Sequence, residues 1–384
     1  MTTASITASW TDSKRYVWLL SPTLPLIVVF ELFCFHRTPL TIYTWIAPII
    51  FYGLLPILDW IIGKDDSNPP ESAIPELEAD WYYRLLVAAF IPLQFVVTIW
   101  GVWIAVHETT TWSQYVGLIF SVGAINGVAI NTAHELGHKK VSWERWLSKI
   151  TLAPVAYGHF FVEHNRGHHR NVATPSDPAS ARLGESFWAF LPRTMIGSLH
   201  SAWSIEKERL ALKGLSPWHW ENDNLQSWAM TIVFFAAITA WAGFWALPFL
   251  FLQAFYGASL LEVVNYLEHY GLLRQKMPDG RFERCRAEHS WNSNYVVGNI
   301  LLYQLQRHSD HHANPTRRFQ ALRDYKDSPQ LPSSYARLLL AAYIPPVWFW
   351  WMDKRVIKHY DGDVTKANIQ PRVREKILRR YAKA

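Results

Sequence analysis

The stretch that decides the fold is EHNRGHHR, residues 163–170, which places His164, His168 and His169 within six residues. If this stretch is α-helical, His164 and His168 lie one turn apart on the same face, and His169 is rotated by about a third of a turn. Neighbouring histidines on a helix therefore diverge. A stretch of this kind can serve two metal ions without crowding either of them.

Three other places in the chain supply histidines in comparable patterns, namely HELGH at 134–138, NYLEHYG at 265–271 and RHSDHH at 307–312. Nine imidazoles suit two metal ions with four or five ligands each. Imidazole accommodates iron, copper, zinc and nickel, so the ligand type alone does not name the metal. The predicted ligands are His134, His138, His164, His168, His169, His269, His308, His311 and His312.

The composition predicts that these histidines are held at a membrane. Half of the 384 residues are hydrophobic, 21 are tryptophan, and the apolar residues fall in long runs, as they do in membrane spans. Two cysteines without a CxxC pair exclude a cysteine-rich zinc or iron–sulfur site in this chain. No cleavage site follows the first apolar run, so we expect that run to be an uncleaved span.

We predict an all-α fold, a bundle of six transmembrane helices with a histidine-rich cap that holds two metals. The chain, residues 1–384, is expected to form a single integral-membrane catalytic domain. The cap is assigned to the polar segments 134–226 and 268–384. The predicted spans cover residues about 16–34, 40–62, 83–106, 115–133, 227–242 and 245–267.

Charge placement predicts the orientation. Of 37 lysines and arginines, 11 lie in residues 139–213 and 21 lie from residue 274 onward, whereas the loops after the first and third spans hold only Arg37. By the positive-inside rule, both termini and every histidine cluster are expected in the cytoplasm. The apolar run 338–352 contains a proline pair and is predicted to be interfacial or re-entrant, because a seventh crossing would export the basic tail.

HELGH by itself also matches the zinc protease pattern HExxH, in which two histidines bind zinc and Glu135 is the general base. A zinc protease needs three protein ligands and one open position, so it leaves most of the nine histidines unexplained. A metal transporter would place its ligands within the spans, whereas these histidines lie at and beyond the span ends. Both alternatives remain open at this point.

The sequence resembles the integral-membrane alkane 1-monooxygenases over essentially its whole length. The motifs that carry the resemblance are NTAHELGHK at 131–139, EHNRGHHRNVATPSDPASAR at 163–182, NYLEHYGL at 265–272 and LQRHSDHHANPTR at 305–317. The second and last motifs are long and specific. The wider group, which includes membrane fatty-acid desaturases and hydroxylases, shares only the histidine spacings and is the nearest alternative.

The resemblance implies a centre of two non-haem iron ions that activates O2 and hydroxylates the terminal carbon of a medium-chain alkane. It also implies electrons from rubredoxin, itself reduced by a flavin-dependent reductase, and a place in the bacterial inner membrane with the active site on the cytoplasmic side. All nine histidines match the iron ligands of the family. An unactivated alkane offers nothing to acid–base or nucleophilic catalysis, which agrees with a metal cofactor.

Metal-bound imidazoles usually donate their second N–H to a carboxylate or a carbonyl. The acidic residues predicted to support the histidines are Asp310 and Glu268 first, then Glu135 and Asp177. The second and fourth spans are candidates for lining an apolar substrate channel. The basic face is expected to meet anionic membrane lipid and an acidic electron carrier. Nucleic acid is not expected as a partner, because no recognition motif accompanies the charge.

Overall fold

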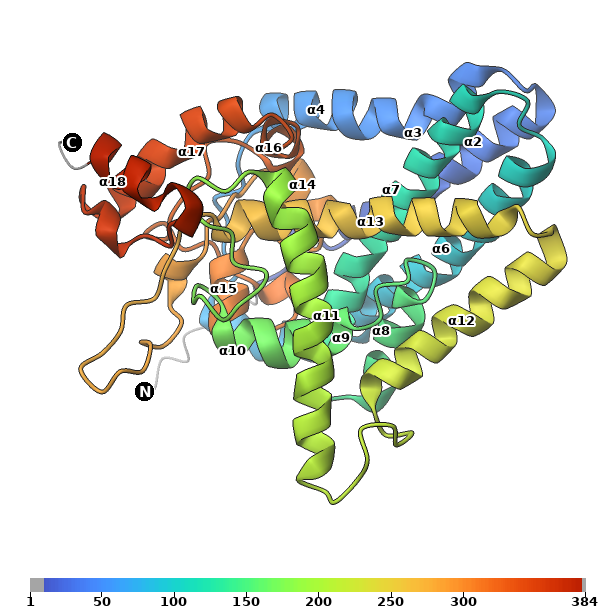
Figure 1. The fold of residues 1–384 in the computed structure, drawn as a ribbon. Coiled ribbons are helices and arrows are strands. Elements are labelled where there is room, and N and C mark those ends of the chain that lie inside the picture. Colours follow the sequence, from blue (N-terminus) through green and yellow to red (C-terminus); the bar gives the residue numbers. More distant parts are fainter. Residues whose placement is uncertain (1–9, 382–384) are drawn as a thin grey trace, which may run out of the picture.

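The computed structural model describes residues 10–381. Its centre is a pair of long helices, α7 (Trp112–Gly137) and α13 (Ala246–His269), that cross the molecule together (Figure 1). Small residues let the two backbones approach closely. A Cβ atom on Gly123 would lie 2.7 Å from the carbonyl oxygen of Gln253, and one on Gly257 would lie 2.9 Å from that of Gly123.

The other membrane-spanning candidates surround this pair. The helices α6 (Trp81–His107) and α12 (Asp223–Ala242) are continuous. The span Thr41–Ile62 is assembled from η2 (Thr41–Trp45), α3 (Ile46–Ile49), the π-helical η3 (Ile50–Leu54) and α4 (Leu55–Ile62). The first apolar run is bent by 47° between its halves, Val17–Thr23 and Leu26–Arg37.

The predicted fold class is confirmed. Across residues 10–381 the elements are helical, and extended pairing is limited to isolated bridges. Five helices are long and apolar enough to cross a membrane, and a sixth is present if the bent first pair counts as one span. Their positions coincide with the six predicted runs. The cytoplasmic side of the cap and the single-domain organisation stay predictions.

The long helix α11 and a set of shorter helices form the cap around one end of the α7–α13 pair. In Figure 1, α11 crosses α13 steeply, and α15 and α10 lie near the same end. The cap elements used below are α8 (Ser142–Leu152), α9 (Phe160–Val162), η5 (Glu163–His168), α10 (His169–Asn171), α11 (Phe187–Ala211), α14 (Val296–Leu301), α15 (His308–Ala313), α16 (Tyr335–Ala342), α17 (Pro345–His359) and α18 (Arg374–Tyr381).

The apolar run near residue 345 forms two short helices, α16 and α17. The proline pair begins α17, a helix of 15 residues, which is short for a crossing of a bilayer. The side chain of Trp348 is fully buried against Tyr266 and Tyr270 of the α13 end. The run therefore packs onto the cap, and it is not among the span candidates.

Candidate metal centre

Two membrane helices deliver histidines to the same end of the molecule. His134 lies in the last turn of α7 and His138 follows directly after it, while His269 is the last residue of α13. The short helix α15 brings His308, with the remaining two histidines of its motif, beside them. The close packing of α7 on α13 therefore sets the distance between imidazoles more than a hundred residues apart in sequence.

The first six residues of EHNRGHHR, Glu163–His168, are π-helical rather than α-helical, and α10 begins at His169. The backbone N–H of His169 donates to the carbonyl of His164, five residues back. In this register residues five apart lie near each other on one face, and the Nε2 atom of His164 meets that of His169. The ring of His168 stacks beside that of His164, but its metal-facing nitrogen belongs to a different histidine group. The α-helical expectation, which paired His164 with His168, is therefore corrected, while the expected divergence of the neighbouring imidazoles of His168 and His169 is retained.

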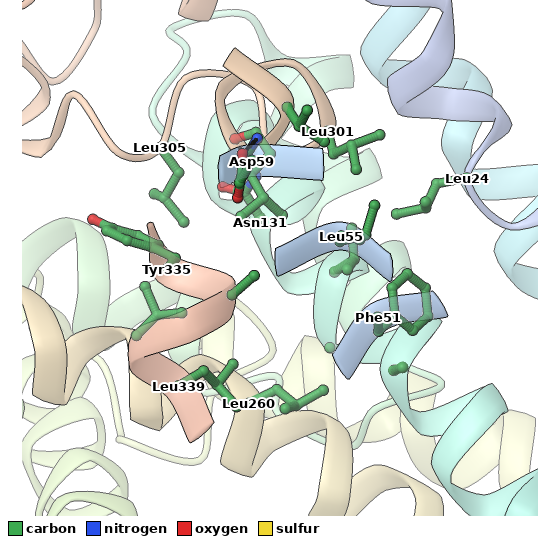
Figure 2. Close-up of a pocket in the computed structure, with 18 of the residues that line it drawn as sticks. Leu24, Phe51, Leu55, Asp59, Asn131, Leu260, Leu301, Leu305, Tyr335 and Leu339 are labelled. Carbon is green, nitrogen blue, oxygen red and sulfur yellow. Dashed lines mark hydrogen bonds between the residues drawn. The ribbon is translucent and has the colours of Figure 1, made fainter. Parts of the chain in front are cut away.

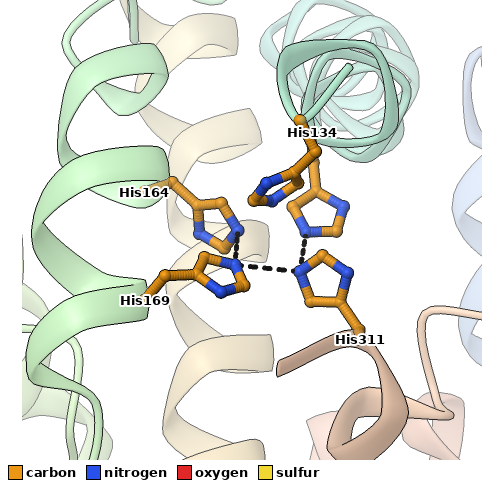
Figure 3. A group of neighbouring side chains, drawn as sticks. His134, His164, His169 and His311 are labelled. Carbon is orange, nitrogen blue, oxygen red and sulfur yellow. Dashed lines mark hydrogen bonds between the residues drawn. The ribbon is translucent and has the colours of Figure 1, made fainter. Parts of the chain in front are cut away.

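One histidine group gathers five imidazoles, which we name the five-histidine group (Figure 3). Their metal-facing nitrogens all lie within 4.8 Å of one another. The Nε2 atom of His311 is 2.9 Å from that of His134 and 3.0 Å from that of His169, and the Nε2 atoms of His169 and His164 are 3.1 Å apart. The members are His134, His138, His164, His169 and His311.

The second group, the four-histidine group, gathers His168, His269, His308 and His312 within the same limit. The Nε2 atom of His308 is 2.9 Å from that of His312 and 3.2 Å from that of His269. The nitrogens of all four side chains converge, and all four residues are buried. All nine predicted histidines thus belong to one group or the other.

The distances between these imidazole nitrogens are those expected of ligands around a metal ion. One proton can form a hydrogen bond between two facing imidazole nitrogens. The Nε2 atom of His311 faces the Nε2 atoms of both His134 and His169 at about the same distance, and one proton cannot bridge both pairs. Metal–imidazole bonds are about 2.0–2.1 Å long, so two ligands at a right angle are about 3.0 Å apart. The observed separations match that spacing, and each group could hold one metal ion.

Burial favours the neutral form of most of these imidazoles, which is the form that binds a metal ion. Burial, with a further contribution from the neighbouring imidazoles, holds six pKa values in the cap well below the usual value of 6.5. These are the pKa values of His138, His164, His169, His308, His311 and His312.

His168 is the exception. Burial acts to lower its pKa, but Asp177, with smaller contributions from Glu163 and Glu262, acts in the opposite direction, and the pKa is raised. The Nδ1 atom of His168 lies 3.0 Å from Asp177 Oδ2, while its Nε2 atom is buried without a hydrogen-bond partner and faces the four-histidine group. This is the arrangement in which a carboxylate orients a metal-bound imidazole through its outer nitrogen.

The Glu268 carboxyl reaches the four-histidine group from the metal-facing side. Its Oε2 atom is 3.2 Å from Nε2 of His308, and its Oε1 atom accepts a 2.7 Å hydrogen bond from the Tyr335 hydroxyl. Glu268 therefore lies where a ligand, or a partner of a ligand, would lie. Tyr335, on the far α16, was not found from the sequence, because nothing in its local pattern connects it to the histidines.

The other two predicted carboxylates bond elsewhere. Asp310 accepts hydrogen bonds from Arg317 at 2.9 and 3.0 Å and from Asn314 at 2.7 Å, and so braces the loop that follows α15. Glu135 pairs with Lys139 at 2.9 Å and accepts from the backbone N–H of Phe319 at 3.3 Å. A general base of a zinc protease needs a free carboxylate beside the metal, so the pairing of Glu135 does not favour that alternative.

A third cluster, with Glu283, Glu288 and His289, could also be taken for a metal site. There the Nδ1 atom of His289 accepts a 2.9 Å hydrogen bond from the backbone N–H of Arg286. The proton of the neutral ring is then on Nε2, which lies 3.3 Å from Glu283. His289 thus has both ring nitrogens engaged and no lone pair for a metal.

An apolar cavity of about 150 Å³ lies among the spans and the cap (Figure 2), and none of the nine histidines lines it directly. It is lined from the second predicted span by Phe51 and Leu55 and from α13 by Leu260. Asn131, one turn before His134 on α7, lies on its wall and donates to the Leu302 carbonyl at 2.7 Å. Apolar cavities of about this size stay dry and bind small hydrocarbons.

The cavity and the four-histidine group share a wall. Tyr335 lines the cavity and bonds to Glu268, which touches His308. Leu305, three residues before His308, lines it as well. The cavity draws on six separate segments of the chain, and the sequence indicated only two of its walls, the second and fourth spans.

Comparison with known proteins identifies relatives of the chain. A family model described as fatty acid desaturase matches residues 110–342. The alkane 1-monooxygenase of Acinetobacter baylyi is 50% identical over 96% of this chain and 91% of its own length. Alkane 1-monooxygenase 1 of Alcanivorax borkumensis is 44% identical over 95% and 91%. The xylene/toluene monooxygenase hydroxylase component XylM of Pseudomonas putida is 28% identical over 83% and 84%.

Proposed function

The chain belongs to the alkane 1-monooxygenases, oxidoreductases of the membrane desaturase and hydroxylase superfamily, and from that premise we propose its detailed activity. It hydroxylates the terminal carbon of medium-chain n-alkanes at a centre of two histidine-ligated iron ions, with electrons from rubredoxin. The observation that carries the proposal is the pair of buried histidine groups beside an apolar cavity.

The nine histidines are the proposed iron ligands, five on one ion and four on the other. When bound, the two irons supply the activation of O2 and the cleavage of an unactivated C–H bond, which no side chain can provide. The protein holds neutral imidazoles in place, with Asp177 fixing the ring of His168. The overall reaction takes an alkane, O2, two electrons and two protons, and yields a primary alcohol and water.

The cavity accounts for terminal selectivity in this proposal. Its polar side chains are satisfied within the protein: Asp59 accepts from the backbone N–H of Gly298 at 3.0 Å, and Asn131 donates to Leu302. The remaining wall is apolar, so a hydrocarbon chain displaces little bound water and is held by shape alone. A narrow site of this kind presents one end of the chain to the histidines.

Electron delivery and orientation are proposed from charge. The two segments that carry most of the basic residues, 139–213 and 274–384, also carry six of the nine histidines. A basic face beside the metal centre would attract an acidic carrier such as rubredoxin. The same charge favours the cytoplasmic side of the bacterial inner membrane for the cap. The flavin-dependent rubredoxin reductase completes the proposed electron path.

A turnover assay tests the proposal. The full chain, purified in lipid nanodiscs, is given octane, ¹⁸O2, rubredoxin, its reductase and NADH, and its metals are quantified. We expect labelled 1-octanol and about two irons per chain, as the two groups imply. Octane left untouched while a fatty acid is desaturated would favour the desaturase alternative, and one zinc per chain without oxygen consumption would contradict the proposal.

The cavity is tested separately by two neighbouring substitutions on α16. Leu339 lines the cavity, whereas Leu340 is 39% exposed on the outer side of the helix. Leu339→Phe should reduce turnover of octane and shift preference toward shorter alkanes, with iron content unchanged. Leu340→Phe, the matched control, should behave as the wild type. Equal effects of the two changes would contradict the assignment of this cavity to the substrate.

A further inference from the structure

The π-helical segment η5 carries ligands for both histidine groups. His164 and, directly after the segment, His169 belong to the five-histidine group, and His168 belongs to the four-histidine group. This division depends on the π register. In an α-helix each residue turns by about 100°, so His169 would lie about 140° from His164 instead of beside it. Isolated π-helical turns are rare and less favourable than α-helical ones, so this turn has to be held.

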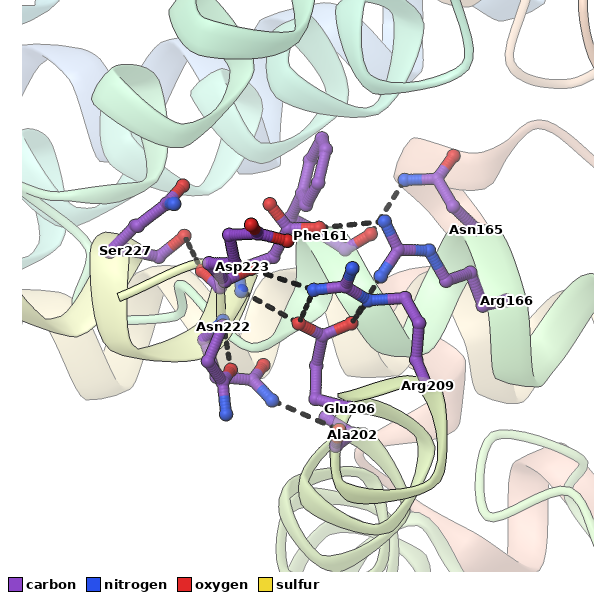
Figure 4. Close-up of polar contacts among 12 residues, drawn as sticks. Phe161, Asn165, Arg166, Ala202, Glu206, Arg209, Asn222, Asp223 and Ser227 are labelled. Carbon is purple, nitrogen blue, oxygen red and sulfur yellow. Dashed lines mark hydrogen bonds and ion pairs between the residues drawn. The ribbon is translucent and has the colours of Figure 1, made fainter. Parts of the chain in front are cut away.

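Arg166 lies in the middle of η5 and points toward Glu206 and Asp223 (Figure 4). Its Nη1 atom donates to Oε1 of Glu206 on α11, and its Nη2 atom donates to Oδ2 of Asp223 at 2.6 Å. Asp223 is the first residue of α12. One guanidinium thus ties the ligand-bearing turn to two other helices.

The two carboxylates that receive Arg166 are themselves fixed. Glu206 is fully buried and accepts two 2.7 Å hydrogen bonds from Arg209. It also accepts from the backbone N–H of Asp223 at 2.7 Å. Asp223 pairs in addition with Lys149 of α8 at 2.5 Å. We name these five residues the charge cluster; because its carboxylates are held independently, they form a rigid anchor for Arg166.

Two further contacts support the same turn. The Asn165 side chain donates to the carbonyl of Phe161 at 2.7 Å. The Glu163 carboxylate lies over Gly167, where a Cβ atom would come within 2.5 Å of its Oε2. The first contact stays within the continuous helical run of α9 and η5, and the second stays within η5, whereas the charge cluster joins η5 to α11 and α12. Arg166 is therefore the residue that fixes the turn relative to α11 and α12.

We propose that Arg166 is a positioning residue for both metal groups, and that its bridge to Glu206 and Asp223 keeps η5 in the π register that divides the histidines between two metals. The inference rests on the metal centre of the proposed function and is independent of the substrate. Without the bridge, η5 can relax toward the α-helical register, which moves His169 out of the five-histidine group and disturbs His168 in the other.

The test compares Arg166→Gln with Arg209→Gln in the full chain in nanodiscs. Each removes one guanidinium from the charge cluster, but only Arg166 is on η5. Release of iron into a chelator and the ligand-field spectrum of cobalt-loaded protein are recorded, together with thermal unfolding. We expect about 10-fold faster iron loss and an altered spectrum for Arg166→Gln, comparable with the loss of a group that orients metal ligands. Arg209→Gln should lose iron more slowly than Arg166→Gln, because Glu206 keeps its bonds from Arg166 and from the backbone N–H of Asp223. Arg166→Lys should recover part of the loss.

Wild-type iron retention and spectrum in Arg166→Gln would overturn the inference, as would equal iron loss in Arg209→Gln. Wild-type protein that binds no iron would instead overturn the proposed function, so the two failures are distinguishable. If Arg166→Gln does not fold, Asp223→Asn is compared with Lys149→Gln. Only the first removes a partner of Arg166, so faster iron loss in that variant alone supports the inference and equal rates overturn it.

Discussion

The five-histidine group and the four-histidine group draw on overlapping segments and yet differ in their surroundings. Among residues 10–381, the five-histidine group has imidazole neighbours and no carboxylate hydrogen-bonded to its rings. The four-histidine group has Asp177 on one ring and Glu268 against another. The group with fewer imidazoles thus has carboxylates in contact, and it is also the one that adjoins the cavity through Tyr335.

The number of histidines alone therefore does not explain how each of the two sites would bind a metal ion. Five neutral imidazoles leave the charge of a bound cation uncompensated, whereas a nearby carboxylate offsets part of it. We expect iron binding by the four-histidine group to depend on its two carboxyl groups, those of Asp177 and Glu268. We expect iron binding by the five-histidine group to depend on the number of its imidazoles. The following four predictions test that contrast, from the largest expected effect to the smallest.

The largest effect is expected from removing a ring. His308→Ala leaves three imidazoles in its group, whereas His138→Ala leaves four in the other. We predict that His308→Ala loses one iron per chain and that its turnover of octane falls by more than about 100-fold. That is more than the loss of a group that only supports a metal ligand usually costs. His138→Ala should retain more iron. Iron analysis and octane turnover measure both, and equal iron loss in the two variants would break the contrast.

The next effect is expected at Glu268. Glu268→Gln keeps the shape of the side chain and removes its negative charge beside His308, so iron affinity at the four-histidine group should fall by about 10–100-fold. Glu135→Gln is the control, since Glu135 pairs with Lys139 and not with an imidazole. Competition with a chelator measures the affinity. A similar fall in iron affinity in Glu135→Gln would mean that removing any negative charge near the metal centre weakens iron binding, whether or not that charge touches an imidazole.

A smaller effect is expected at Asp177. Asp177→Asn keeps an acceptor oxygen for the Nδ1 proton of His168 but weakens the hydrogen bond, because bonds to charged acceptors are about twice as strong as neutral ones. Iron affinity at the four-histidine group should fall by about 10-fold. Asp177→Ala, which removes the acceptor, should lose more. If the alanine variant binds iron as the wild type does, the carboxylate does not orient His168.

The smallest effect is expected at Tyr335. Tyr335→Phe removes the hydroxyl that donates to Glu268 and leaves the cavity wall apolar. A buried hydrogen bond of this kind contributes about 1 kcal/mol, so turnover should fall by less than about 10-fold, with two irons retained. Steady-state kinetics on octane measures the change. A loss as large as that of Glu268→Gln would give Tyr335 a role beyond holding that carboxyl.

Much of the architecture follows from local pattern. The apolar runs predicted the helices that can span a membrane, because a bilayer requires about 20 apolar residues in a row, and the long helices α7 and α13 end where their histidines were expected. The motifs at residues 163–182 and 305–317 predicted the family, which the relatives confirm. Asp177 lies against a histidine as predicted, whereas Asp310 holds a loop.

Residue type and spacing along the chain were enough to predict the all-α class, the candidate spans and the family, and to select the nine histidines that the structure gathers as candidate metal ligands. Tertiary structure alone decided which histidines share a group. The π register of η5 pairs His164 with His169, and hydrophobic periodicity does not distinguish a π turn from an α turn. The charge cluster, the cavity and Tyr335 likewise join residues that are far apart in sequence, and only the packing of helices brings them within reach of the histidines.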